Sequence, residues 1–170
     1  MTRNAGLYTL ERTMAKKVVV LGANFGGLTA ALSLKKDLKN DVEVTVVSDR
    51  DYFLFNPSLI WLPFGARNEN SVTFKVAPTF EKAGVGFILS AAVEIIPDQK
   101  IVKLANGTSI SYDYLVIATG TRNKPEAVQG LFENTRTITT LQDAESAGRE
   151  WNKFLQNPGD IVIAATQGAS

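Results

Sequence analysis

A chain of 170 residues is long enough for one domain with a buried core. Its 45% apolar and 21% charged residues are typical of globular proteins, and a net charge of +1 calls for neither nucleic acid nor an anionic membrane as partner. With no cysteine and no histidine, these residues cannot supply a thiol nucleophile, a disulfide, a Cys/His zinc site or an imidazole base. The composition therefore favours binding over covalent or general-base chemistry, and predicts no metal site.

The first fourteen residues carry charges but lack the apolar core of a signal peptide. We expect residues 1–14 to form a disordered extension, or to result from a start codon assigned too far upstream, because Met14 directly precedes the first predicted strand. No later apolar run approaches the roughly 20 residues that span a bilayer. Cytoplasm is the default location.

Residues 17–48 read as strand, glycine turn, helix and second strand. The segment from Lys17 to Leu21 contains three valines and predicts a strand buried on both faces. From Gly26 onward, apolar residues recur with the spacing of one helix face, and the β-branched residues 42–48 predict the second strand. Such a unit is expected to be parallel and right-handed.

The turn in VVVLGANFGG is the first candidate site. A dinucleotide fingerprint places glycine where the turn is tight, where the backbone approaches the pyrophosphate, and where helix and strand pack closely. Here those positions hold Gly22, Asn24 and Gly27, with an additional Gly26. Asn tolerates a positive φ better than most residues; its side chain either occupies space that the ligand needs or donates a hydrogen bond to phosphate. Glycine-rich turns also occur in α/β domains that bind nothing, but the flanking strands and helix favour nucleotide binding.

The second strand ends where an acidic residue usually bonds the adenosine ribose. Ser48 stands there, followed by Asp49 and Arg50. The Ser48 hydroxyl can still bond a ribose hydroxyl. Arg50 is either a phosphate contact or a solvated loop charge.

The segment 51–66 is aromatic and interrupted by prolines. We expect four of its aromatic side chains to belong to the core: Tyr52, Phe53, Phe55 and Trp61. A short helix around Pro78–Lys82 and a strand at Val85–Leu89 are predicted next.

A change of pattern follows at about residue 91. Short strands flank Asn106-Gly107, the strongest short hairpin signal. Residues 114–120 predict a return to a buried parallel strand, and a helix is expected to begin near Thr139 or Thr140. The apolar run 161–164 predicts a final strand, which would open a second nucleotide-fold unit at about 160–170.

This order of elements, ending in the Ala-Thr-Gly of residues 118–120, resembles the FAD domain of flavoprotein reductases with two dinucleotide folds. The stretches VVVLGANFGGLTAAL, SDRDYFLFNPS, ISYDYLVIATG and NPGDIVIAATQGAS are similar to sulfide:quinone oxidoreductases. The resemblance implies a Rossmann-like FAD/NAD(P)-binding α/β fold over residues 15–170: a parallel sheet, helices on one face and a small β-meander crossover, incomplete at the C-terminal end. It covers only the N-terminal portion of such an enzyme.

The resemblance also implies FAD as cofactor and a set of contact residues. Gly22, Asn24, Gly26 and Gly27 would lie at the pyrophosphate, Ser48, Asp49 and Arg50 on the adenosine side, Asn56 and Pro57 on the approach to the flavin, and Ala91 and Ala92 on the adenine strand, with Thr119 and Gly120 completing the set. The full-length enzyme would use a cysteine pair to pass electrons from sulfide through FAD to a membrane quinone.

Several positions depart from that family. Asn24 replaces the middle glycine, and Thr139 stands where some members carry a cysteine. The segment Phe53–Pro57 lacks the cysteine of related flavocytochrome subunits, which favours the quinone-linked branch. In the family, a cysteine of the sulfide site follows the Gly-Ala-Ser of residues 168–170. Peripheral membrane contact would come only from the C-terminal part of the family, which this sequence does not include.

Three other interpretations stay open. An NADH:quinone reductase would need a second glycine fingerprint, but those positions hold Ala164, Thr166 and Ala169. A non-catalytic dinucleotide-binding module would bind nucleotide without turnover. An inactive truncated product would bind flavin weakly, and its exposed sheet edge would invite association into homo-oligomers.

Overall fold

The computed structural model describes residues 14–164, which divide into two compact units. Within the described residues, the first unit comprises 14–53 and 75–120, and the second comprises 54–74 and 121–164. The predicted extension 1–14 lies outside the described residues except for Met14, as do residues 165–170 with Thr166, Gly168 and Ala169.

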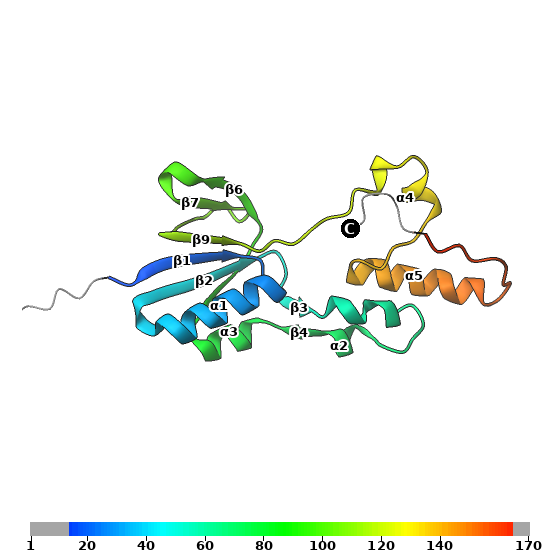
Figure 1. Ribbon diagram of the computed structural model, residues 1–170, viewed down its shortest axis with the longest axis horizontal. Helices are drawn as coiled ribbons and strands as arrows, with labels where there is room; N and C mark the ends of the chain where they lie inside the picture. The colour runs from blue at the N-terminus through cyan, green and yellow to red at the C-terminus, as the bar shows by residue number, and fades with distance from the viewer. Residues whose placement is uncertain (1–13, 165–170) are drawn as a thin grey trace, which may run out of the picture. The chain divides into compact units, whose positions relative to one another are not determined.

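The first unit is built on a parallel sheet of four strands (Figure 1). The strands are β1 (Lys16–Leu21), β2 (Val42–Ser48), β5 (Gly86–Leu89) and β9 (Tyr114–Ile117), in the order β5-β2-β1-β9. Val20 pairs with Val46 on one side and with Val116 on the other, so β1 is central and buried, as predicted.

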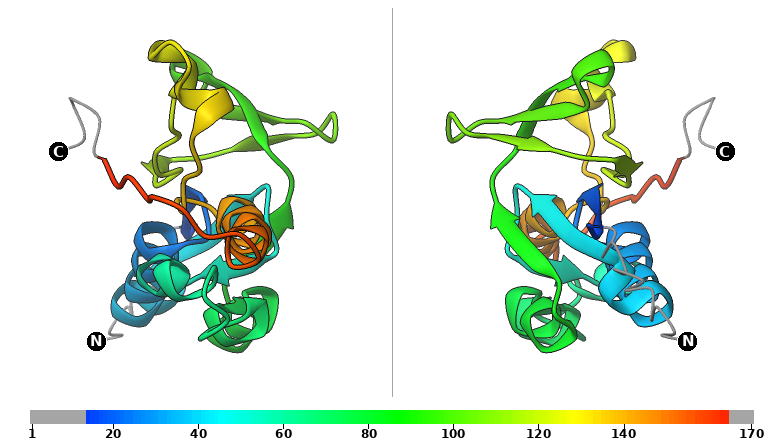
Figure 2. Two further views of the ribbon diagram at one scale, coloured as in Figure 1. Left: turned by 90° about the vertical axis from the view of Figure 1, so that its right-hand side faces the viewer. Right: turned by 90° about the vertical axis from the view of Figure 1, so that its left-hand side faces the viewer.

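Alternation along β1 and β2 sends side chains to two separate cores. On one face, Val18, Val20 and Val46 pack with Ala31 of helix α1 (Phe25–Leu38) and Phe80 of helix α3 (Ala77–Ala83). Both helices lie on that face of the sheet (Figure 2). The predicted helices and their parallel strands are therefore confirmed.

The other face of the sheet is covered by an antiparallel meander. Its strands are β6 (Ala92–Ile96), β7 (Ile101–Leu104) and β8 (Ser109–Ser111). Val102 and Leu104 of β7 pack against Val19 and Leu21 of β1. The hairpin predicted at Asn106-Gly107 is confirmed, with Gly107 at φ 84°. The predicted fold class, a Rossmann-like sheet with helices on one face and a meander, is confirmed.

A two-stranded ribbon, β3 (Tyr52–Leu54) and β4 (Thr73–Lys75), carries the chain from the first unit to the second and back. At its first-unit end, the Val76 amide donates to the Asp51 carbonyl at 3.0 Å, and the Lys75 ammonium lies 2.6 Å from the Asp51 carboxylate.

The second unit is helical. It contains the 3-10 helix η2 (Asn56–Trp61), α2 (Glu69–Val72), α4 (Leu131–Asn134) and α5 (Leu141–Phe154). Thr140 caps α5 by accepting a hydrogen bond from the Asp143 amide while the Asp143 carboxylate accepts one from the Thr140 amide, which confirms the predicted start of this helix. The second unit also contains the 3-10 turn η4 (Pro125–Ala127), whereas η1 (Lys39–Asp41) and η3 (Pro97–Gln99) belong to the first unit.

Two strand predictions need correction. Strand β9 is parallel as expected, but Tyr114 and Ile117 are 60% and 63% exposed because β9 is the edge of the described sheet. Residues 161–164 form no strand, and Val162 and Ile163 are almost fully exposed. An apolar run becomes a strand only when another strand pairs with it, and within residues 14–164 no strand pairs with this run.

The aromatic predictions are confirmed only in part. Phe53 is 7% exposed and joins the helix-side core, whereas Phe55 and Trp61 are 44% and 50% exposed. Composition alone could not separate them because burial depends on which side of a segment meets a neighbour.

Phe80→Ala should lower the free energy of unfolding by about 3–5 kcal/mol, because it empties a fully buried site. Phe132→Ala removes the same atoms from a side chain that is 69% exposed, and should change the free energy of unfolding by less than about 0.5 kcal/mol. Urea unfolding of both variants tests this assignment of the core; equal losses would contradict it.

Candidate functional site

The residues predicted at the nucleotide site follow the carboxyl ends of neighbouring parallel strands. The turn Gly22–Gly27 follows β1, and Ser48 is the last residue of β2, with Asp49 and Arg50 directly after it. Ala91 comes shortly after β5, and residues 119–120 come after β9. Since parallel strands end at one edge of a sheet, all of these residues lie along that edge. The chain extends outward from β1 through β2 to β5 and then returns to β9 on the other side of β1, so the glycine turn lies where the strand order reverses. Open α/β sheets bind their ligands at this position.

Gly22 and Gly27 are required by the packing of the protein itself. Gly22 has φ 101°, and a Cβ atom there would collide with the carbonyl oxygen of Ala118 at the end of β9. A Cβ atom on Gly27 would collide with the carbonyl oxygen of Gly22. The Gly22 amide donates to the Val47 carbonyl at 2.8 Å. The turn is therefore held against both neighbouring strands, with helix α1 starting directly over it.

Gly26 differs from these two glycines. It is exposed, and a Cβ atom there would meet only the Ala118 Cβ at 3.4 Å, an ordinary van der Waals contact. The first turn of α1 contains no acidic residue. The positive end of the helix dipole is thus exposed on this edge, without a carboxylate in that turn to repel phosphate. These features fit a dinucleotide pyrophosphate.

Asn24 does not adopt the positive φ that asparagine tolerates better than most residues. It is the N-cap residue of α1 with φ −90°, and its carbonyl accepts a hydrogen bond from the Leu28 amide at 2.8 Å. The positive φ of the turn belongs to Gly22. Asn therefore fits here without backbone strain.

At the end of β2, Ser48 is 7% exposed and its hydroxyl oxygen accepts a hydrogen bond from the Arg50 amide at 3.2 Å. A hydroxyl that accepts one bond can still donate its own proton. The Arg50 guanidinium lies 5.7 Å from the ring centre of Tyr52, and its Nε is 3.8 Å from the Asp49 carboxylate. Because both charged side chains are well exposed, this ion pair adds little stability.

The remaining predicted residues have different surroundings. The half-buried Ala91 accepts a hydrogen bond from the Ala105 amide at 2.9 Å, and Ala92 begins β6. Gly120 has φ 76° with open space around its Cβ position, so its backbone conformation favours glycine. Asn56 and Pro57 begin η2 and belong to the second unit.

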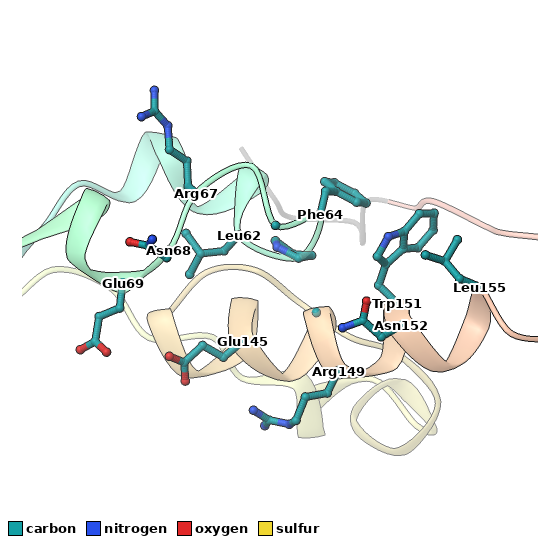
Figure 3. A pocket seen from close by; sticks show the side chains of 13 residues that line it. Leu62, Phe64, Arg67, Asn68, Glu69, Glu145, Arg149, Trp151, Asn152 and Leu155 are labelled. Carbon is teal, nitrogen blue, oxygen red and sulfur yellow. The ribbon is translucent and has the colours of Figure 1, made fainter.

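The second unit contains an open hollow of about 620 Å³ (Figure 3). Leu62 and Phe64 line it on one side, and Arg149 and Trp151 of α5 on the other. The Phe64 and Trp151 rings meet edge to face at 5.2 Å. None of the predicted binding residues lines this hollow, so the case for a nucleotide site rests on backbone geometry at the sheet edge.

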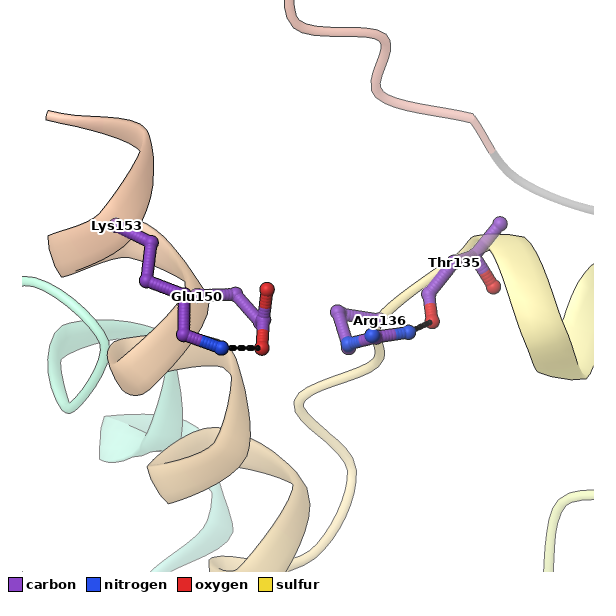
Figure 4. A network of polar contacts seen from close by, with 4 residues as sticks. All are labelled: Thr135, Arg136, Glu150 and Lys153. Carbon is purple, nitrogen blue, oxygen red and sulfur yellow. Dashed lines mark hydrogen bonds and ion pairs between the residues drawn. The ribbon is translucent and has the colours of Figure 1, made fainter. Parts of the chain in front are cut away.

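Figure 4 shows a network of polar contacts that includes Glu150 and Lys153 of α5. The Lys153 ammonium donates to the Glu150 carboxylate at 3.0 Å and lowers the pKa of that carboxyl, as do the positive charges of Arg136 and Arg149. A lowered pKa means that the ionised carboxylate is favoured in the folded helix, so this stabilisation is present near neutral pH and is lost as the pH falls through the folded-state pKa. It supports the helix and suggests no proton-transfer role.

In the described part of the chain, no group of three or more acidic side chains is arranged to hold a metal ion. Over the same residues, no helix has both the length and the apolar character needed to cross a bilayer.

Residues 16–163 match the family model for pyridine nucleotide-disulphide oxidoreductases. The chain belongs to this family. Its members include FAD-binding oxidoreductases, in agreement with the geometry of the glycine turn.

Within this family, the chain is 38% identical to the sulfide-quinone reductase of Aquifex aeolicus, over 92% of this chain and 36% of the relative. It is 29% identical to the external NADH-ubiquinone oxidoreductase 2 of Saccharomyces cerevisiae mitochondria, over 87% of this chain and 28% of that protein. The X-ray structure of the Aquifex aeolicus sulfide:quinone oxidoreductase superposes with a TM-score of 0.80 at 36% identity, covering 85% of this chain and 33% of that one. The chain thus spans about a third of the length of these family members.

Sequence reasoning missed two features of the site. The Ala118 carbonyl, which excludes a side chain at Gly22, is a backbone group and leaves no signal in residue type. Phe25 occupies a variable position of the fingerprint, where the pattern makes no demand, yet its ring packs on Phe53.

Gly22→Ala should lower the free energy of unfolding by at least about 1–3 kcal/mol, because it combines a left-handed φ with a backbone collision. Gly159→Ala is the control: it adds the same methyl group in open space and should change stability by less than about 0.5 kcal/mol. Thermal unfolding of both variants without added nucleotide measures the difference; a stable Gly22→Ala variant would contradict the geometry described for this turn.

Proposed function

We propose that this chain is the FAD-holding part of a flavoprotein that oxidises sulfide and reduces a quinone. The carrying observation is the glycine turn at the reversal point of the sheet, whose packing leaves Gly26 and the first turn of α1 exposed. The 38% identity to a sulfide-quinone reductase supports the choice of substrates.

The proposed contacts follow the sheet edge. Amides in the first turn of α1, around Gly26 and Gly27, would donate to the pyrophosphate, where the helix dipole favours negative charge. The Asn24 side chain would add a further donor. Ser48, whose hydroxyl can donate, would bond a ribose oxygen, and Arg50 would balance phosphate charge on the adenosine side.

The other predicted contacts complete this proposal. Ala91 and Ala92 would border the adenine, and Thr119 and Gly120 would border the dinucleotide at the end of β9. Asn56 and Pro57, at the start of η2, would approach the flavin. These assignments are residue-by-residue proposals from the family pattern.

Bound FAD would accept two electrons from the sulfur donor and release them to the quinone. The chain itself would hold and orient the cofactor. Since it contains neither cysteine nor histidine, thiol chemistry would have to come from residues outside these 170. The proposal includes contact between a full-length form and the membrane that holds the quinone. It also includes self-association into a homo-oligomer.

An NADH:quinone reductase is the second candidate, supported by the 29% identity to a yeast NADH-ubiquinone oxidoreductase. The lack of glycine at Ala164, Thr166 and Ala169 weighs against a second nucleotide turn there.

Refolding the chain with FAD should give the visible absorption bands of bound flavin after free FAD is removed. In a form extended to the full length of its relatives, sulfide should bleach those bands, and a quinone analogue should restore them. Bleaching by NADH but not by sulfide would favour the second candidate. Absence of flavin bands in both forms would refute the flavoprotein proposal.

Gly26→Asp should weaken FAD binding at least about tenfold, because its carboxylate would face the pyrophosphate across the first turn of α1. The same charge favours the helix N-terminus, so the unfolding temperature of the apoprotein should not fall. Thr29→Asp adds an equal charge on an exposed position about one turn further along the helix and should affect FAD binding less. Fluorescence titration with FAD compares the two; equal weakening would argue against phosphate at this turn.

A further inference from the structure

The glycine turn carries one large side chain, Phe25, at the first residue of α1. Its ring centre lies 4.7 Å from that of Phe53, with the planes at 66°, which is an edge-to-face arrangement. Aromatic pairs with this geometry stabilise the folded protein by more than the burial of their apolar surface alone would give. Phe25 is nevertheless 44% exposed, so it is not a core residue of the sheet.

Phe53 offers a fixed surface for this contact. It is 7% exposed and belongs to the core cluster that contains Val20, Val76 and Phe80. The ribbon that carries it is tied to the start of α3 by the hydrogen bond from the Val76 amide to the Asp51 carbonyl. The Phe25 ring therefore links the first turn of α1 to a buried cluster that is formed mainly by the sheet and α3.

Such a link has a physical purpose in a turn with three glycines, Gly22, Gly26 and Gly27. Glycine loses more backbone freedom on ordering than any other residue. A turn that is ordered only by its ligand loses part of the binding free energy to that ordering, whereas a turn ordered beforehand does not.

We propose that Phe25 is a positioning residue that orders the first turn of α1, through its contact with Phe53, before the dinucleotide pyrophosphate binds. The inference rests on the proposed nucleotide-binding function and deepens it. The residue acts on the phosphate-binding amides and need not touch the flavin ring.

This predicts a specific pattern of affinities. Phe25→Ala should weaken FAD and ADP by the same factor, about three- to tenfold, because both ligands carry the pyrophosphate. Phe25→Tyr keeps the ring edge and should restore both affinities to within about twofold of the unsubstituted chain. Phe64→Ala is the matched control, since it removes the ring of another edge-to-face pair, in the second unit, and should leave both affinities unchanged.

The measurement is a titration of the apoprotein with FAD and, separately, with ADP, alongside the unfolding temperature of each variant. If Phe25→Ala does not fold, Phe25→Leu, which keeps the apolar bulk without the ring, takes its place. A double-mutant cycle with Phe53→Leu adds a second readout: because the two rings act as a pair, the double variant should bind no more weakly than Phe25→Ala alone.

The outcomes separate the two proposals. If the unsubstituted chain binds neither FAD nor ADP, the proposed function fails. If it binds both and Phe25→Ala binds them equally well, only the positioning role is overturned. Loss of FAD affinity without loss of ADP affinity would also overturn it, because Phe25 would then be a flavin contact.

Discussion

The first unit depends on one close backbone contact, that of Gly22 with the end of β9. A left-handed φ and a neighbouring carbonyl oxygen both require glycine there, and the Gly22 carbonyl in turn requires glycine at position 27. Through these contacts, the start of α1 is fixed against the central strand β1 and its edge neighbour β9. The turn has its shape without a ligand because the protein itself provides the steric constraint.

The arrangement of the two cores then leaves the edge of the sheet for binding. Valines of β1 and β2 alternate between the helix side and the meander side, and both faces are covered. The carboxyl edge keeps exposed backbone at Gly26 and Gly120. A ligand at this edge meets amide groups and a helix dipole, which suits a phosphate group better than an apolar molecule.

Much of this organisation could be predicted from the residues, although some of its reasons could not. The strands, the main helices and the hairpin at Asn106-Gly107 follow from local periodicity and turn chemistry, and the structure confirms them. The tolerance of asparagine for a positive φ is not needed at Asn24, because Gly22 takes the left-handed conformation of the turn. Burial was wrong for Phe55 and Trp61, and the strand predicted at 161–164 is not formed, because each depends on a partner distant in the chain.

By itself, the sequence determined the α/β class, the position of the glycine turn and the absence of thiol and imidazole groups, because these depend on residue type and short-range spacing. Only the tertiary structure decided which glycines the protein itself requires, that Ser48 accepts a bond from its own turn, and that Phe25 packs on Phe53. The contacts of Gly22 with Ala118 and of Phe25 with Phe53 join residues far apart in the chain, whereas those of Gly27 with Gly22 and of Ser48 with Arg50 are local. All of them depend on atomic positions that local patterns do not encode.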